Sequence, residues 1–131
     1  MRITHSHKIL LIGAGNMAKE YAKVLKAMKK DFLVVGRNKK NALIFEKEIG
    51  TQVIVGGLEK WIKNRENKIP PIAIVATNED QLGSSARLLM KYGIRSILIE
   101  KPGGIDLKDL RQTERLAIKP RAKVFIAYNR R

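Results

Sequence analysis

Two glycines and an alanine stand at a spacing that suits phosphate binding. The sequence Gly13-Ala14-Gly15-Asn16-Met17-Ala18 follows a short apolar run and opens a segment with helical periodicity. In such a GxGxxA pattern the first glycine allows a tight turn, the second lets the backbone approach a pyrophosphate, and the small last residue allows close packing. The N–H groups and dipole of the helix start favour an anion. The pattern predicts a dinucleotide site; the alternative is an ordinary strand–helix turn that needs glycine.

A second candidate feature is the stretch Gly36-Arg37-Asn38, which Lys39 and Lys40 follow. Sites that prefer NAD usually place Asp or Glu about 20 residues beyond the glycines, where it binds the ribose 2′-hydroxyl. Arg37 stands there instead, and a guanidinium pairs well with a 2′-phosphate. We therefore expect NADP rather than NAD as cofactor. The alternative is a solvated basic start of a helix.

Two further segments follow apolar runs, at Thr77-Asn78 and at Glu100-Lys101-Pro102. Thr77 and Asn78 have the polar groups to bind ribose or pyrophosphate, or equally to cap the next helix. Lys101 is the candidate catalytic residue, because a lysine in a cofactor crevice binds a ribose hydroxyl or polarises a substrate hydroxyl or carbonyl. The peptide before Pro102 is a candidate for the cis form, and the alternative for the whole segment is a turn with an exposed lysine.

Short apolar runs that alternate with helix-period segments would position these residues. Runs at 8–12, 32–35, 52–55, 72–76, 96–99 and 123–128 predict strands, and segments at 15–30, 38–49, 57–65, 80–92 and 107–118 predict helices. On the first helix we expect Met17, Ala18, Tyr21, Val24, Leu25 and Met28 on one face, and on the last helix Leu107, Leu110, Glu114 and Ile118. The alternation predicts an α/β fold with a doubly wound, parallel, six-stranded sheet covered on both faces, in the order 3-2-1-4-5-6.

The chain has 131 residues, 27 Lys and Arg against 12 Asp and Glu, a formal charge of +15 and no cysteine. The length predicts one domain, and the missing thiols exclude disulfides and cysteine-ligated metal sites. No apolar run approaches the roughly 20 residues of a membrane span, so we expect a cytoplasmic protein. We predict no metal site, since His5 and His7 have no third ligand nearby in the sequence. The basic excess is spread over both halves of the chain, which disfavours nucleic-acid binding without excluding it.

Four motifs occur in order: GAGNMA, ATN, EKPGG and, at the end, AYNRR. Together they resemble the N-terminal domain of the Gfo/Idh/MocA (glucose–fructose oxidoreductase/inositol dehydrogenase) family. The resemblance covers essentially the whole chain, and Glu100-Lys101-Pro102 is its most specific element. It implies a Rossmann domain, normally coupled to a C-terminal α/β domain, that moves hydride between nicotinamide and the hydroxyl of a sugar, nucleotide-sugar or cyclitol. It also implies a carbohydrate-type substrate and a role in carbohydrate metabolism.

The resemblance assigns roles to individual residues. Cofactor contacts fall on Gly13, Gly15, Asn16, Met17, Ala18, Gly36, Arg37, Asn38, Thr77, Asn78, Glu100, Lys101 and Pro102, with Lys101 also beside the substrate. The family often has a histidine shortly after the threonine of the ATN motif, and residues 78–82 of this sequence contain none.

Residues 1–131 are expected to form the dinucleotide-binding domain alone, without the family's substrate domain. We therefore expect this chain to bind the cofactor with negligible turnover. Its partners could be a second copy of itself, in a homo-oligomer, or a different chain. The alternative function is a stand-alone dinucleotide-binding or interaction module without catalysis.

Overall fold

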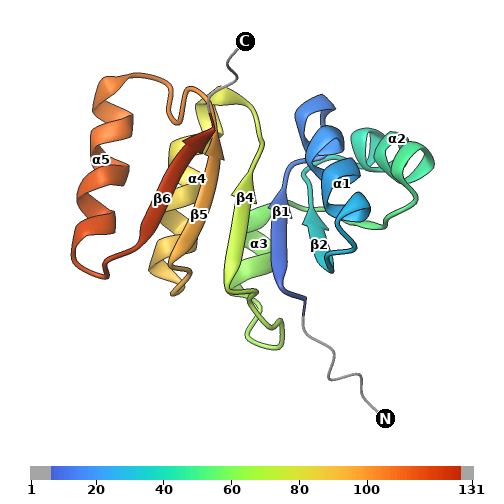
Figure 1. Ribbon diagram of the computed structural model, residues 1–131, viewed down its shortest axis with the longest axis horizontal. Coiled ribbons are helices and arrows are strands. Elements are labelled where there is room, and N and C mark those ends of the chain that lie inside the picture. The colour runs from blue at the N-terminus through green and yellow to red at the C-terminus, as the bar shows by residue number, and fades with distance from the viewer. Residues whose placement is uncertain (1–6, 128–131) are drawn as a thin grey trace.

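A computed structural model of the 131-residue chain describes residues 7–127. The elements alternate strand and helix from β1 to β6 (Figure 1). The strands are β1 (Ile9–Ile12), β2 (Phe32–Val35), β3 (Val53–Ile54), β4 (Ile72–Val75), β5 (Ser96–Glu100) and β6 (Lys123–Ala127). The helices are α1 (Asn16–Ala27), α2 (Lys39–Ile49), α3 (Leu58–Lys63), α4 (Glu79–Lys91) and α5 (Leu107–Ile118). Every predicted element is therefore present, with ends that shift by a few residues.

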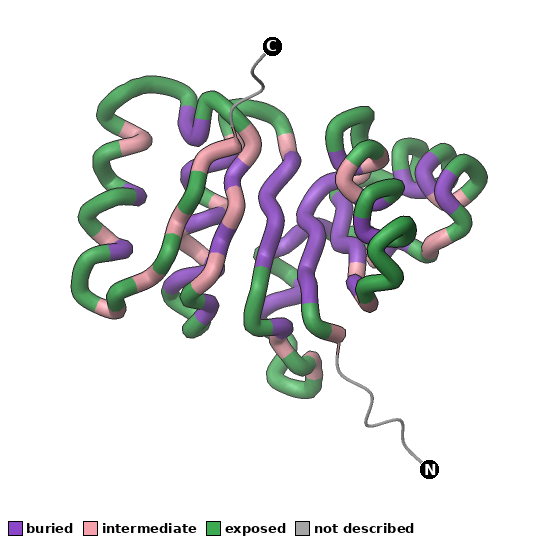
Figure 2. The backbone as a smooth tube through the Cα atoms, in the orientation of Figure 1, coloured by how far each residue is buried: buried purple, intermediate pink, exposed green. Residues whose placement is uncertain are grey.

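All six strands pair in parallel in the order β3-β2-β1-β4-β5-β6, as predicted. The order reverses at β1, which lies between β2 and β4. Strands β1 and β4 are central and buried along most of their length (Figure 2). Near-continuous apolar runs such as residues 9–12 are typical of parallel strands that are covered on both faces.

Two hydrophobic clusters fill the two sides of the sheet. One contains the buried side chains of α3 and α4 with Ala117 of α5, and the other contains those of α1 and α2. Phe45 and Trp61 lie in the core. Helix α2 ends at the predicted residue and begins one residue later than predicted, at Lys39. Asn38 caps it by accepting a hydrogen bond from the N–H of Asn41 at 2.7 Å, and Gly50 ends it with φ of 81°.

The predicted faces of two helices are wrong in part. On α1 the residues Ala18, Ala22 and Leu25 are buried, whereas the larger Met17, Val24 and Met28 are exposed. Small alanines let this helix lie close to the sheet, so they take the inward positions. On α5 the predicted stripe fails similarly, because Leu107, Glu114 and Ile118 are exposed and Leu110 is half-buried, while Thr113 and Ala117 are buried.

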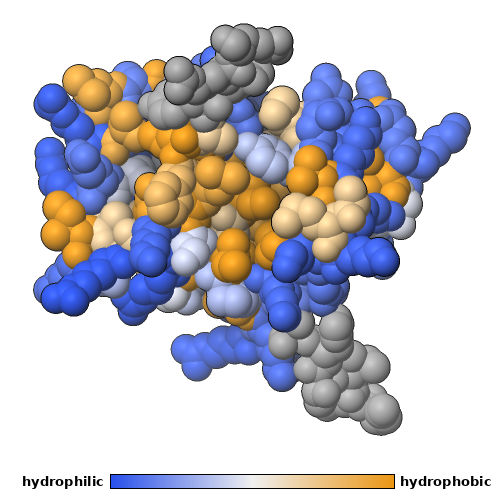
Figure 3. All heavy atoms as spheres, viewed as in Figure 1, coloured by the Kyte–Doolittle hydropathy of each residue, from blue (hydrophilic) through white to orange (hydrophobic). Residues whose placement is uncertain are grey.

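The cover of the sheet is also less complete than predicted. Helices α1 and α2 lie over the β1–β3 half of one face, and within residues 7–127 no helix covers the β5–β6 half of that face (Figure 1). Phe125 of β6 is 62% exposed there. Hydrophobic side chains gather over this side of the molecule, with hydrophilic residues around them (Figure 3). In the described part of the chain, no helix is long and apolar enough to cross a membrane.

Candidate cofactor-binding site

A cleft of about 590 Å³ lies beyond the carboxyl ends of β1, β2 and β4, where the strand order reverses. Its lining includes nine predicted residues: Gly13, Gly15, Asn16, Met17, Gly36, Arg37, Asn38, Thr77 and Asn78. Crevices at this position in doubly wound sheets are where ligands usually bind. The structure therefore brings together most of the predicted cofactor contacts, although they come from three distant parts of the chain.

Gly13 makes the tight turn at the end of β1. Its φ is 121°, and a Cβ atom at this position would lie 2.4 Å from the carbonyl oxygen of Ala76. Two main-chain hydrogen bonds of 2.8 Å hold the backbone here. The N–H of Gly13 donates to the oxygen of Val35, and the N–H of Ala76 donates to the oxygen of Ile12. Only glycine fits this crossing of β1 and β4 without distortion.

Gly15 serves a different purpose at the start of α1. It is the N-cap residue with an ordinary φ of −92°, and a Cβ atom there would meet no atom within 4 Å. No side chain caps the helix. The backbone at the start of α1 is therefore left open to the cleft, as a pyrophosphate needs. Ala18 is fully buried between α1 and the sheet and lies outside the lining.

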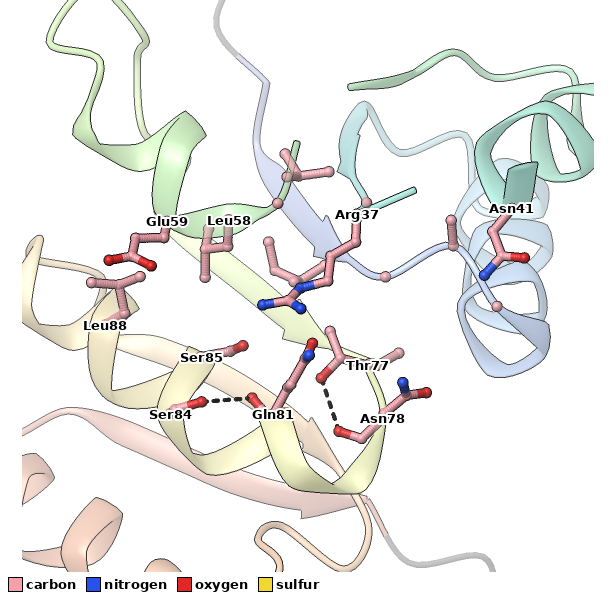
Figure 4. Close-up of a pocket in the computed structure, with 18 of the residues that line it drawn as sticks. Arg37, Asn41, Leu58, Glu59, Thr77, Asn78, Gln81, Ser84, Ser85 and Leu88 are labelled. Carbon is pink, nitrogen blue, oxygen red and sulfur yellow. Dashed lines mark hydrogen bonds between the residues drawn. The ribbon is translucent and has the colours of Figure 1, made fainter. Parts of the chain in front are cut away.

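At the end of β2, Gly36 is closely packed and the Arg37 side chain enters the cleft. A Cβ atom on Gly36 would lie 3.1 Å from Val53 and 3.2 Å from Ala14, so only a very small residue fits there. The Arg37 side chain reaches into the cleft towards Gln81 and Ser85 of α4 (Figure 4). Within residues 7–127 its guanidinium forms no ion pair.

Two lysines that follow Arg37 do not share its position. Lys39 and Lys40 are exposed on α2 and are not among the residues that line the cleft. The predicted basic cluster at the end of β2 is therefore reduced to Arg37 in the cleft.

Thr77 and Asn78 follow β4 and face the cleft (Figure 4). Asn78 occupies the N-cap position of α4, yet its side chain makes no capping hydrogen bond. The Thr77 hydroxyl donates weakly to the Asn78 carbonyl, at 3.3 Å. The Asn78 side chain thus does not cap α4, and it lines the cleft instead.

The Glu100-Lys101-Pro102 segment lies outside this cleft. Glu100 ends β5 and accepts a hydrogen bond of 2.6 Å from the Tyr21 hydroxyl of α1. Burial, this hydrogen bond and the negative charge of Glu100 raise the pKa of Tyr21 well above its ordinary value. Lys101 and Pro102 are exposed in a turn, and the peptide between them is cis.

Several lining residues carry no recognisable sequence signal. Helix α4 contributes Gln81, Ser84, Ser85, Arg87, Leu88 and Lys91, while Asn41 and the start of α3 complete the opposite wall. The α4 residues share only their position, because they lie on the side of this helix that faces away from Leu82 and Leu89. Arg87 is held by Asp109 at 2.8 Å and by the Thr113 hydroxyl at 2.9 Å.

The next feature is the set of side chains that could bind a metal ion in the described part of the chain. No three His, Asp or Glu side chains in residues 7–127 are grouped to hold a metal ion. His7 lies 3.0 Å from Asp31, and His5 is outside the described residues, as are residues 128–131 of the terminal motif.

A sequence profile described as "Oxidoreductase family, NAD-binding Rossmann fold" matches residues 7–128. The chain belongs to the Gfo/Idh/MocA family. The resemblance first seen in the four motifs is thereby confirmed, and so is the Rossmann fold. This Gfo/Idh/MocA domain has the strand order, the Gly13 turn and the cleft that binding of a dinucleotide requires.

Solved structures share the fold. The UDP-N-acetylglucosamine 3-dehydrogenase GnnA from Acidithiobacillus ferrooxidans is 17% identical with a TM-score of 0.73, over 92% of this chain and 36% of that one. The WlbA dehydrogenase from Bordetella pertussis, in complex with NADH and UDP-GlcNAcA, is 14% identical with a TM-score of 0.75, over 92% and 36%. GenD2 from gentamicin A biosynthesis, in complex with NAD, is 20% identical with a TM-score of 0.73, over 97% and 37%. The Gfo/Idh/MocA domain thus spans little more than a third of these relatives.

No curated protein matches the sequence significantly.

Proposed function

We propose that this chain is the NADP-binding part of an oxidoreductase that transfers hydride between nicotinamide and a carbohydrate-type hydroxyl or carbonyl. The NADP preference is based on the residues that follow β2: Arg37 enters the cleft, and none of residues 36–38 is acidic. A carboxylate there would repel a 2′-phosphate, whereas a guanidinium binds one through paired hydrogen bonds. The NAD and NADH in the related structures support the dinucleotide class and leave the 2′-phosphate open.

Each wall of the cleft has one task in this proposal. The Gly13–Ala18 segment would hold the pyrophosphate, with Asn16 and Met17 at its edge and Ala18 behind it in the core. Gly36, Arg37 and Asn38 would hold the adenosine end. Thr77 and Asn78 together would contact the ribose and the pyrophosphate. When bound, the nicotinamide supplies or accepts the hydride.

Lys101 is proposed as the catalytic residue, with Glu100 and Pro102 fixing the turn that carries it. Glu100 is itself held by Tyr21, so β5 ends in a braced position next to β4. From there an exposed ammonium group would bind a ribose hydroxyl or polarise the reacting oxygen of the substrate. Nucleotide-sugars are the substrate class that the related dehydrogenases suggest.

Hydride transfer also needs the substrate carbon held close to the nicotinamide ring. The chain spans about 36% of relatives such as GnnA, so we propose that residues outside it complete the substrate pocket, from a second domain or another chain. This chain would then bind the cofactor with negligible turnover by itself. A cytoplasmic location belongs to the same proposal.

The test is a titration of the purified chain with NADPH and with NADH, for wild type and Arg37→Ala. One charge-assisted hydrogen-bonded pair contributes about 1.5–3 kcal/mol, so wild type should bind NADPH at least tenfold more tightly. Arg37→Ala should lose most of that preference while its NADH affinity stays within about threefold. Lys39→Ala is the matched control, because Lys39 is exposed and outside the cleft. Equal affinities of wild type for the two cofactors would refute the role of Arg37.

A further inference from the structure

A second hollow of about 500 Å³ adjoins the adenosine side of the cleft. Both hollows share Arg37, Gly57, Leu58 and Glu59, so Arg37 stands on the boundary between them. The second hollow adds Gly56, Lys60 and Lys63. Three of its seven lining residues are cationic and one is acidic, which makes it suitable for an anionic group.

The turn between β3 and α3 shapes this hollow. Gly56 and Gly57 have φ of 109° and 90°, which other residues rarely adopt. The N–H of Gly57 donates to the Gly36 oxygen at 2.8 Å, and that of Gly56 donates to the Arg37 oxygen at 3.3 Å. The turn is thus fixed against the residues that end β2.

The stems of two cationic side chains cross the bare surface of that turn. A Cβ atom on Gly57 would lie 3.7 Å from Cγ of Arg37, and a Cβ atom on Gly56 would lie 3.4 Å from Cδ of Lys60. Arg37, at the end of β2, and Lys60, on helix α3, therefore each lie against one of the two adjacent glycines of this turn. The sequence gives no hint of this, since 23 positions separate them.

The charges of the hollow are unevenly paired. Lys63 binds Glu59 at 3.1 Å, whereas Arg37 and Lys60 form no ion pair within residues 7–127. Two unpaired cations thus lie over one turn, and a phosphate monoester carries nearly two negative charges at neutral pH.

We propose that Lys60 is a second specificity residue, which binds the ribose 2′-phosphate together with Arg37. This inference rests on the proposed NADP preference and adds a residue to it. Glu59 opposes the same ligand, because this acidic residue lines both hollows and also neutralises Lys63. Arg37 supplies a directional fork, and Lys60 supplies a solvated point charge that reaches the phosphate along its flexible stem.

The experiment uses Lys60→Gln and Glu59→Gln, titrated with NADPH, NADH, adenosine 2′,5′-bisphosphate and adenosine 5′-monophosphate. Lys60→Gln should weaken NADPH and the bisphosphate about threefold at low salt, with NADH and the monophosphate unchanged. Glu59→Gln should tighten the two 2′-phosphorylated ligands about twofold, because it removes a repelling charge and releases Lys63. Lys40→Gln is the matched control, an exposed lysine outside both hollows.

Salt supplies an independent readout. Screening over about 10 Å at 0.1 M weakens exposed charge pairs, so the difference between Lys60→Gln and wild type should shrink between 20 and 500 mM NaCl. A Lys60→Gln protein that keeps the wild-type NADPH to NADH ratio, while Arg37→Ala loses it, would overturn the role of Lys60 and leave the NADP proposal standing. A wild type without any preference for 2′-phosphorylated ligands would instead overturn the NADP proposal, and the role of Lys60 with it.

Discussion

The two glycines of the GxGxxA motif should respond oppositely to the same substitution. Gly13→Ala places a Cβ atom 2.4 Å from the Ala76 carbonyl oxygen, about 1 Å inside normal contact. The backbone on both sides is fixed by hydrogen bonds of 2.8 Å, so the strands cannot separate cheaply. Overpacking of this kind costs about 1–3 kcal/mol, and a φ of 121° on alanine costs a further 1–3 kcal/mol. We expect a loss of about 4 kcal/mol in the free energy of unfolding.

Gly15→Ala should leave the fold nearly unchanged. Its φ of −92° suits alanine, and no atom lies within 4 Å of the new methyl group. Replacing an N-cap glycine by alanine costs at most about 1 kcal/mol. The methyl group would instead stand in the cleft where the pyrophosphate approaches the backbone, so we expect NADPH affinity to fall at least tenfold.

Urea unfolding followed by the fluorescence of Trp61 measures both free energies, because Trp61 is the single tryptophan and is buried. Thermal unfolding gives a second measure, in which 4 kcal/mol corresponds to a midpoint lowered by roughly 10–20 °C for a chain of this size. Cofactor titration then follows on the Gly15→Ala protein. The reasoning is refuted when Gly13→Ala unfolds within 1 kcal/mol of wild type, or when Gly15→Ala is equally destabilised and binds the cofactor normally.

Other substitutions test side-chain contacts elsewhere in the domain. Burial would raise the pKa of Asp109, but hydrogen bonds from the Ile105 N–H and Arg87, with the charge of Arg87, hold it below its ordinary value. Asp109→Asn should therefore cost about 1.5–3 kcal/mol at pH 7, and in acid titrations of stability the difference from wild type should shrink below about pH 4 as wild type becomes protonated. Gly83→Ala should destabilise the protein although alanine favours helices, because its Cβ atom would lie 2.4 Å from the Asp109 carboxylate. Urea unfolding measures the loss of stability, and adding Asp109→Ala should relieve the clash. Tyr21→Phe should remove a loss of stability that wild type shows above about pH 10, since the folded state keeps the Tyr21 hydroxyl protonated after the unfolded chain has ionised; chemical unfolding between pH 8 and 11 measures it.

The sequence predicts the order of the elements well because their periodicity is a local property. Runs such as Ile72–Val75 are apolar throughout, and α4 buries Leu82, Ala86, Leu89 and Met90, which recur at helical spacing. Helix α1 shows where periodicity fails. Hydrophobicity ranks Met17 and Val24 above Ala18 and Ala22, but the close approach of α1 to the sheet reserves the inner positions for alanine.

The cleft is predictable only where a residue follows a strand. Gly13, Arg37 and Thr77 do so, and the topology brings strand ends together. Gln81, Ser84 and Ser85 line the same cleft from α4, yet neutral polar residues on a helix are ordinary surface residues in any sequence. The position of Lys60 beside Arg37 depends on the Gly56-Gly57 turn, whose φ values only a structure reveals.

The separation between the cleft and Lys101 follows from the strand order. The cleft spans the ends of β2, β1 and β4, and β5 pairs with β4 on the far side, with Val75 opposite Ile99. On the proposed function, a dinucleotide with its adenosine at Arg37 and its pyrophosphate at Gly15 extends past β1 towards β4. Its other end then comes beside the end of β5, where Lys101 stands. Cofactor choice and hydride transfer would thus depend on opposite ends of one ligand, so substitutions at Arg37 or Lys60 should change which cofactor binds without changing the chemistry at Lys101.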